Sequence, residues 1–177
     1  FLGAGIQTCR RLIDDGFIGT PIGSAAYMIG CGHESWHPDP EFYYKRGGGP
    51  MFDMGPYYLT AMINLMGGVQ RVFSASKITF PKRTITSQPL AGKVMDVDVN
   101  TYIAGTVQYA SGAIGTIFTT FDVQFPREKS RFIEIYGSEG TLFVPDPNDF
   151  SGTIQLYRPE EGVTREIPMM YGYPENS

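Results

Sequence analysis

The sequence is poor in several residue types on which whole classes of protein depend. Its 177 residues include two cysteines and two histidines, and 14 basic against 18 acidic residues give a net charge of −4. Cys9 and Cys31 are too few for a disulfide scaffold and fit a reducing compartment. The chain has no basic cluster, which argues against a nucleic-acid partner. No apolar run is long enough to span a membrane, and no signal peptide is visible. We therefore expect a soluble, cytoplasmic domain with no membrane partner.

The residues that are abundant favour a sheet-rich domain. Hydrophobic residues make up 42 % of the chain, enough for one substantial core at this length. The 22 glycines, 13 prolines and 14 % aromatic residues favour strands and turns over a helical bundle.

Two helices are expected in the first part of the chain. Apolar side chains recur there at helical spacing: Leu2, Ile6, Cys9 and Ile13. Gly16 is a suitable residue to end this helix. The second helix is expected at residues 55–66, with Asp53 near its N-cap and Pro56 in its first turn. Between the helices, residues 32–50 are expected to form an irregular loop.

The remainder of the chain reads as strands joined by short turns. Strands are expected at residues 21–31, 70–80, 99–109, 113–123, 131–137, 140–146, 153–159 and 164–168. Consecutive hairpins build antiparallel sheets. We therefore predict an α+β fold with a largely antiparallel open sheet and helices packed on one face.

A possible metal-binding motif lies in the loop between the two helices. Residues 33–37, HESWH, spell the H-E-x-x-H signature of zinc peptidases. That signature works only on a helix, where both imidazoles reach one ion. Gly32 precedes the motif and Pro38 and Pro40 follow it, so a helix is not expected. A zinc hydrolase is a remote alternative, and we predict no metal site.

The glycines at the start of the chain resemble part of a nucleotide-binding motif. Residues 3–8, GAGIQT, begin a dinucleotide fingerprint but lack its third glycine and the strand that should precede it. We predict a glycine-containing helix start there and no cofactor-binding residue in this chain.

The segment around Asp53 is the most informative for chemistry. Three glycines, residues 47–49, permit a close approach of the backbone, and Asp53 and Tyr57 follow at a spacing of four. An ionised carboxylate can orient a substrate hydroxyl, and a phenol can donate or relay a proton. From residue types alone, a helix cap and a packed tyrosine explain the pair equally well.

Longer segments of the sequence resemble a known family. The segments GFIGTPIG, GGGPMFDMGPYYLTAMINLMGGVQRV and IEIYGSEGTLFVPD are similar to the C-terminal domain of the Gfo/Idh/MocA oxidoreductases. The family pattern is a Gly-rich stretch, then D-x-G-x-H or D-x-G-x-Y, then an amphipathic helix. Here tyrosine stands where histidine is commoner, which leaves the acid/base group open.

The resemblance implies that one domain binds the cofactor and another binds the substrate. An N-terminal Rossmann domain would bind NAD or NADP and supply a lysine beside the nicotinamide. Residues 1–19 would then be the last helix of that domain and a linker. Residues 20–177 would be a C-terminal substrate and oligomerisation domain, truncated at its end. Asp53 and Tyr57 would be its catalytic residues.

The same resemblance suggests which residues contact the substrate. The loop before the Gly-rich stretch would line the pocket, which makes His33, Trp36 and His37 candidate binding residues for a sugar or polyol. Asp122, at a strand end, is a weaker candidate. Trp36 offers a flat apolar face of the kind that receives a sugar ring. For His37, a loop histidine bonded to the backbone is an equally good interpretation.

The predicted function is an NAD(P)-dependent oxidoreductase acting on a sugar or polyol hydroxyl, with homo-oligomers formed through the open sheet. This chain alone would be inactive. The alternative is a non-catalytic ligand-binding or assembly module. The sequence does not distinguish NAD from NADP or identify the substrate.

Overall fold

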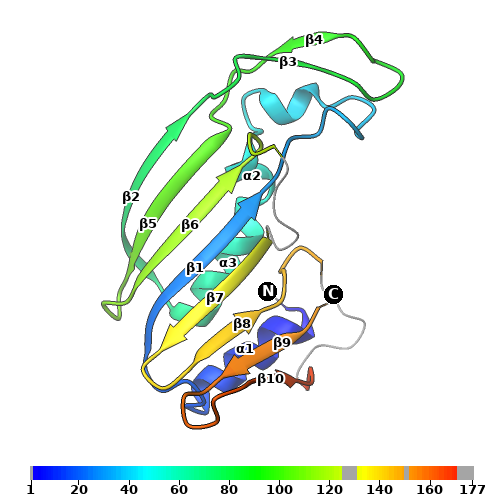
Figure 1. The fold of residues 1–177 in the computed structure, drawn as a ribbon. Helices are drawn as coiled ribbons and strands as arrows, with labels where there is room; N and C mark the ends of the chain where they lie inside the picture. Colours follow the sequence, from blue (N-terminus) through cyan, green and yellow to red (C-terminus); the bar gives the residue numbers. More distant parts are fainter. Residues whose placement is uncertain (1, 125–130, 150–151, 171–177) are drawn as a thin grey trace.

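The computed structural model describes residues 2–124, 131–149 and 152–170, and within them most strands belong to one eight-stranded sheet (Figure 1). Its strands are β1 (Pro21–Ile29), β2 (Val69–Lys77), β5 (Tyr102–Tyr109), β6 (Ile114–Thr120), β7 (Arg131–Gly137), β8 (Thr141–Val144), β9 (Ile154–Tyr157) and β10 (Thr164–Ile167). Their spatial order is β10-β9-β8-β7-β1-β6-β5-β2.

The described helices lie on one face of this sheet, and no described helix covers the other face, which we call the open face (Figure 1). They are α1 (Ala4–Asp14), α2 (Pro50–Asp53) and α3 (Gly55–Met66), with a short 3-10 helix, η1 (Glu41–Tyr44), before α2. Helix α3 packs on β1, α1 packs on β8 and on α3, and α2 contacts β5 and β6. The predicted α+β fold, with helices on one face of a largely antiparallel sheet, is confirmed. None of the described helices is long and apolar enough to cross a membrane.

The sheet contains one parallel pair that the sequence pattern did not predict. Strand β1 is antiparallel to β7 but parallel to β6, with Ala25 opposite Thr116. Hairpin signals report only on strands that are neighbours in sequence, and β1 and β6 are far apart in the chain. The predicted turn at residues 110–112 does join β5 and β6 as an antiparallel hairpin, with Gly112 at φ 90°.

One hydrophobic core joins the helices to the covered face of the sheet. Alternate strand residues such as Ile133 and Ile135 of β7 are fully buried there. From α3, Tyr58 and Met62 enter the same core, and so does Cys9 of α1. Helix α1, which we expected to be the last helix of another domain, therefore packs as part of this core. A boundary at residue 19 stays a prediction.

The structure fills one segment that had no predicted element and decides one alternative that the sequence left open. Residues 81–98, which carried no assignment, form an arm with a two-stranded hairpin of β3 (Lys82–Thr84) and β4 (Val94–Asp96) at one end of the sheet (Figure 1). Asp53 does not cap α3, because it is the last residue of α2 and Met54 holds the N-cap position without a side-chain bond. The reason is Pro56, whose missing N–H cannot continue a helix through Phe52.

Candidate active site

The Gly-rich loop places Asp53 by packing against the backbone of η1. The amide of Gly49 donates to the carbonyl oxygen of Tyr43 at 2.6 Å, and Gly49 has φ 87°. A Cβ on Gly48 would lie 2.5 Å from the carbonyl oxygen of Phe42. Side chains at these positions would push the loop away from η1. The close approach expected from the glycines is therefore made to the chain itself, and it fixes where α2 begins.

Asp53 and His33 come together at the end of α2. Nε2 of His33 lies 3.6 Å from Oδ2 of Asp53, and their side chains are 12 % and 27 % exposed. Burial, and secondly the nearby charge of Asp53, raises the pKa of Tyr43 above its ordinary value. An acid, an imidazole and a neutral phenol therefore share one partly exposed region.

Aromatic rings hold the imidazole of His33 on several sides. It stacks on Tyr43, with ring centroids 3.7 Å apart and an angle of 8° between the planes. The ring of Phe121 meets it edge-on at 4.5 Å, and Trp36 lies at 5.3 Å. Such contacts restrict the ring to one orientation. Trp36 itself is 62 % exposed, so its outer face is available to a ligand.

The arm fastens the loop that carries His33. Arg83 of β3 forms buried ion pairs with Glu34, next to His33, and with Asp122 after β6. Its guanidinium also lies 4.9 Å from the centre of the Tyr44 ring. Burial favours a lower pKa for Arg83, but the hydrogen bond to Glu34 and the surrounding charges outweigh it and raise the pKa. A permanently charged residue therefore ties three separate segments together.

The arm also bonds to the loop backbone. The amides of Thr86 and Ser87 both donate to the carbonyl oxygen of Glu34 at 2.9 Å. Further along, Lys93 pairs with Glu41 of η1 at 2.6 Å. The position of His33 thus depends on residues that the sequence analysis did not single out. The segment holding Arg83 carries no motif or periodicity that could have revealed this role.

The predicted catalytic residues lie on consecutive short helices. Asp53 ends α2, and Tyr57 lies in the first turn of α3 with a side chain that is 42 % exposed. The spacing of four therefore crosses a break between helices and does not run along one continuous helix.

His37 is engaged by the loop itself. Its Nδ1 accepts a hydrogen bond from the amide of Asp39 at 3.1 Å, and its carbonyl oxygen accepts one from the Ser87 hydroxyl. This is the backbone-bonded interpretation that the sequence left open. We leave His37 out of the proposed site.

Asp122 has a structural environment. It is 8 % exposed, its Oδ1 pairs with Arg83 and its Oδ2 accepts from the hydroxyl of Thr101 at 2.8 Å. Because both oxygens already serve the protein, Asp122 is poorly placed to bind a substrate, and we leave it out of the proposed site as well.

The H-E-x-x-H segment does not adopt the geometry of a zinc site. Residues 33–37 form a single turn, closed by the amide of His37 donating to the carbonyl oxygen of His33 at 3.0 Å. Glu34, which would activate the water, is paired with Arg83. Among the described residues, no group of three or more His, Cys, Asp and Glu side chains could hold a metal ion.

The glycines at the start of the chain do not fit a nucleotide. A Cβ on Gly5 would lie 2.6 Å from Cγ of Pro145, so this glycine permits close packing of α1 on the end of β8. In a dinucleotide site the backbone at the glycines must be accessible to the pyrophosphate, whereas Gly5 is covered by Pro145. The residues described therefore do not form a dinucleotide cradle at GAGIQT.

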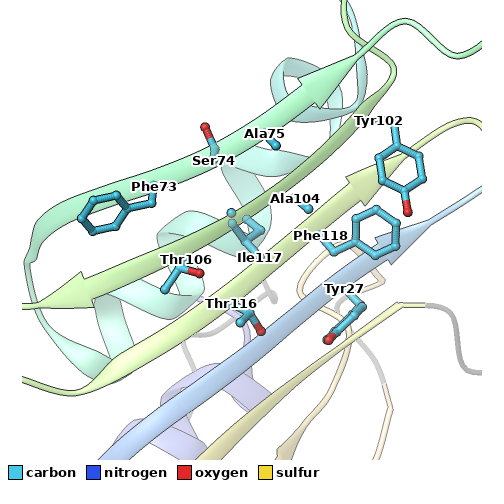
Figure 2. A pocket seen from close by; sticks show the side chains of 11 residues that line it. Tyr27, Phe73, Ser74, Ala75, Tyr102, Ala104, Thr106, Thr116, Ile117 and Phe118 are labelled. Atoms are coloured by element: carbon cyan, nitrogen blue, oxygen red, sulfur yellow. The ribbon is translucent and has the colours of Figure 1, made fainter.

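A concave region lies on the open face of the sheet, on the side opposite the helices. A pocket of about 570 Å³ lies above β1, β2, β5 and β6, and Figure 2 shows the side chains that line it. Tyr27, Tyr102 and Phe118 stand together on this face, with the ring centroids of Tyr102 and Phe118 4.9 Å apart. Phe73 on β2 is 63 % exposed. This surface combines aromatic rings with the hydroxyls of Ser74, Thr106 and Thr116, and Asp53 does not line it.

Comparison with known proteins identifies the family. The sequence profile of the GFO/IDH/MocA C-terminal domain matches residues 6–143. The chain belongs to this family. No curated protein matches the GFO/IDH/MocA domain described here.

Solved structures share the fold of this GFO/IDH/MocA domain at low identity. An NAD binding oxidoreductase from Klebsiella pneumoniae is 22 % identical, with a TM-score of 0.72 over 93 % of this chain and 43 % of its own. Levoglucosan dehydrogenase in complex with NADH and L-sorbose is 17 % identical, with a TM-score of 0.71 over 98 % and 49 %. An oxidoreductase domain protein from Kribbella flavida is 23 % identical, with a TM-score of 0.67 over 93 % and 45 %. The chain thus spans less than half the length of each.

Proposed function

We propose that this chain is the substrate-binding and oligomerisation domain of an NAD(P)-dependent oxidoreductase that acts on a sugar or polyol hydroxyl. The observation that carries the proposal is the partly exposed pair of Asp53 and His33 in a domain of this family. The complexes of levoglucosan dehydrogenase with NADH and sugars support the substrate class.

In the proposed site, Asp53 accepts a hydrogen bond from the reacting hydroxyl and orients it. Tyr57, exposed one turn into α3, contacts the same substrate through its phenol. Trp36 offers its exposed face to the apolar side of a sugar ring, as aromatic residues do in carbohydrate sites.

The nicotinamide cofactor would be held by residues outside this domain. The solved relatives are about twice as long as the part this chain covers, which supports a further nucleotide-binding domain in the whole protein. The cofactor supplies the acceptor for hydride, and the residues described here supply substrate position and proton transfer. We expect the 177 residues alone to show no saturable micromolar binding when titrated with NADH. Such binding would contradict this assignment of the cofactor.

The direct test of function is oxidation of sugars and polyols by the full-length protein. Formation of NADH or NADPH with at least one member of a panel is the expected result. Asp53→Asn should lower kcat/KM by about 100-fold or more, because an amide does not replace the charge of a carboxylate that positions the substrate. A variant with unaltered dehydrogenase activity would instead favour a non-catalytic assembly module.

We also propose that the open face of the sheet is covered by a second copy of the chain. Edge strand β2 is exposed along its whole length, and Phe73 lines the same pocket as Tyr27, Tyr102 and Phe118, at its opposite end (Figure 2). Exposed apolar patches of this kind mark protein interfaces. Phe73→Asp should shift the protein to a smaller species in light scattering, whereas Thr60→Asp on the exposed side of α3 should not. An unchanged mass for Phe73→Asp would refute this arrangement.

A further inference from the structure

His33 and Asp53 present two polar atoms to the same space. Nε2 of His33 and Oδ2 of Asp53 are 3.6 Å apart, and both side chains are partly exposed. A hydroxyl oxygen at an ordinary hydrogen-bond distance of about 2.8 Å from each atom would complete a triangle with them. One substrate hydroxyl can therefore reach both atoms: it donates its single proton to the carboxylate as the substrate binds, and to Nε2 when the proton transfers.

The imidazole is held in this orientation before any ligand binds. It stacks on Tyr43, meets Phe121 edge-on, and is attached through its backbone amide, which donates to the Tyr44 hydroxyl at 3.2 Å. Behind it, the buried pair of Arg83 and Glu34 ties the loop to the arm. A base fixed in this way loses little conformational freedom when it acts.

An imidazole is also a better proton acceptor at neutral pH than a phenol. Histidine titrates near 6.5 and tyrosine near 10 in model peptides, so a tyrosine serves as a base only with the help of a nearby cation. Tyr57 is the residue at the usual acid/base position of the family pattern, but it lies on the far side of the helix break from Asp53. His33 is already at the carboxylate.

We infer that His33 accepts the proton of the reacting hydroxyl and that Asp53 stabilises the resulting imidazolium. The inference rests on the proposed oxidoreductase function. The O–H bond breaks as its proton passes to Nε2 of His33, the carbinol C–H bond breaks as hydride leaves for the oxidised nicotinamide, and a carbonyl forms. Tyr57 then contributes a hydrogen bond and is not the base.

The surroundings of His33 contain charges of both signs. Among the residues that the structure describes, the titratable and charged groups packed around it include Asp53, Tyr43, Tyr44, Glu34, Arg83, His37 and Asp122. Arg83 is paired with the two carboxylates Glu34 and Asp122, whereas the carboxylate of Asp53 lies 3.6 Å from Nε2 of the imidazole. Removing this anion should therefore make the imidazolium less favourable.

The first experiment measures oxidation kinetics of the full-length protein as a function of pH. His33→Gln should lower kcat by about 100-fold to 10,000-fold, the usual contribution of a general base. It should also abolish the fall of kcat/KM at low pH, because that fall reports protonation of the base. Tyr57→Phe should lower kcat by less than about tenfold, and its kcat/KM should still fall at low pH. His37→Gln is the matched control and should remain within about threefold of the unmodified protein.

The second experiment needs no turnover. NMR titration of the His33 ring, assigned by its loss in His33→Gln, should show a lower midpoint in Asp53→Asn than in the unmodified protein. An unchanged midpoint of the His33 titration overturns the inference that Asp53 stabilises the imidazolium. A His33→Gln enzyme that keeps its kcat, and whose kcat/KM still falls at low pH, overturns the role of His33 as the base. A larger loss in Tyr57→Phe than in His33→Gln also overturns it. An unmodified protein that oxidises no panel member refutes the proposed function itself, a result distinct from these.

Discussion

Replacing Arg83 by methionine should unfold the protein at a markedly lower denaturant concentration. The side chain of Arg83 is 6 % exposed, and those of its partners Glu34 and Asp122 are 13 % and 2 % exposed. Removing one partner from a buried ion pair costs about 3–5 kcal/mol, because the remaining charge has lost its compensation. The hydrogen bond from Thr101 to Asp122 remains and offsets about 1 kcal/mol. We therefore expect a loss of about 3 kcal/mol.

Urea unfolding of Arg83→Met, compared with the unmodified protein at equal m-value, measures this loss. Lys82→Met is the matched control, because Lys82 on the same strand pairs with Asp96 at 3.6 Å with both side chains largely exposed, and its midpoint should not move. Adding Asp122→Asn to Arg83→Met should recover about 1 kcal/mol, since the buried charge is gone. A loss below about 1 kcal/mol for Arg83→Met would refute the view that this network holds the loop.

Two further predictions concern close packing and thiol chemistry. Gly137→Ala should destabilise the protein by about 2 kcal/mol or more, because the new Cβ would lie 2.0 Å from the carbonyl oxygen of Ile18. Gly68→Ala, with open space around it, should leave the unfolding midpoint unchanged or slightly raised. In the folded chain a thiol reagent should modify the exposed Cys31 and spare Cys9, whose burial raises its pKa. Equal labelling of both thiols would contradict the buried position of α1.

The sequence predicted best those elements whose signal is local. Helix α3 has the predicted bounds of residues 55–66, because its apolar stripe and the Gly67 that follows it lie close together in the chain. Gly16, at φ 80°, ends α1 as expected. The β3–β4 arm was missed because its strands are short and carry no alternating pattern.

The candidate site was predicted in its parts and not in its arrangement. The sequence singled out both Asp53 and His33, but as separate members of a helix terminus and a loop. Their approach depends on Gly48 and Gly49 packing against η1 and on Arg83 reaching the loop from the arm. These contacts join residues that are distant in the chain and produce no periodic pattern in the sequence, so local sequence patterns could not predict them.

The amino-acid order by itself determined the fold class, the family and the residues capable of chemistry, because periodicity, turn residues and motifs act over a few positions. The tertiary structure alone decided that β1 runs parallel to β6, that Asp122 pairs with Arg83 and that the imidazole of His33 meets the carboxylate of Asp53. These pairings join distant segments. Their free energy comes from desolvation, stacking and charge in three dimensions, and spacing along the chain does not encode it.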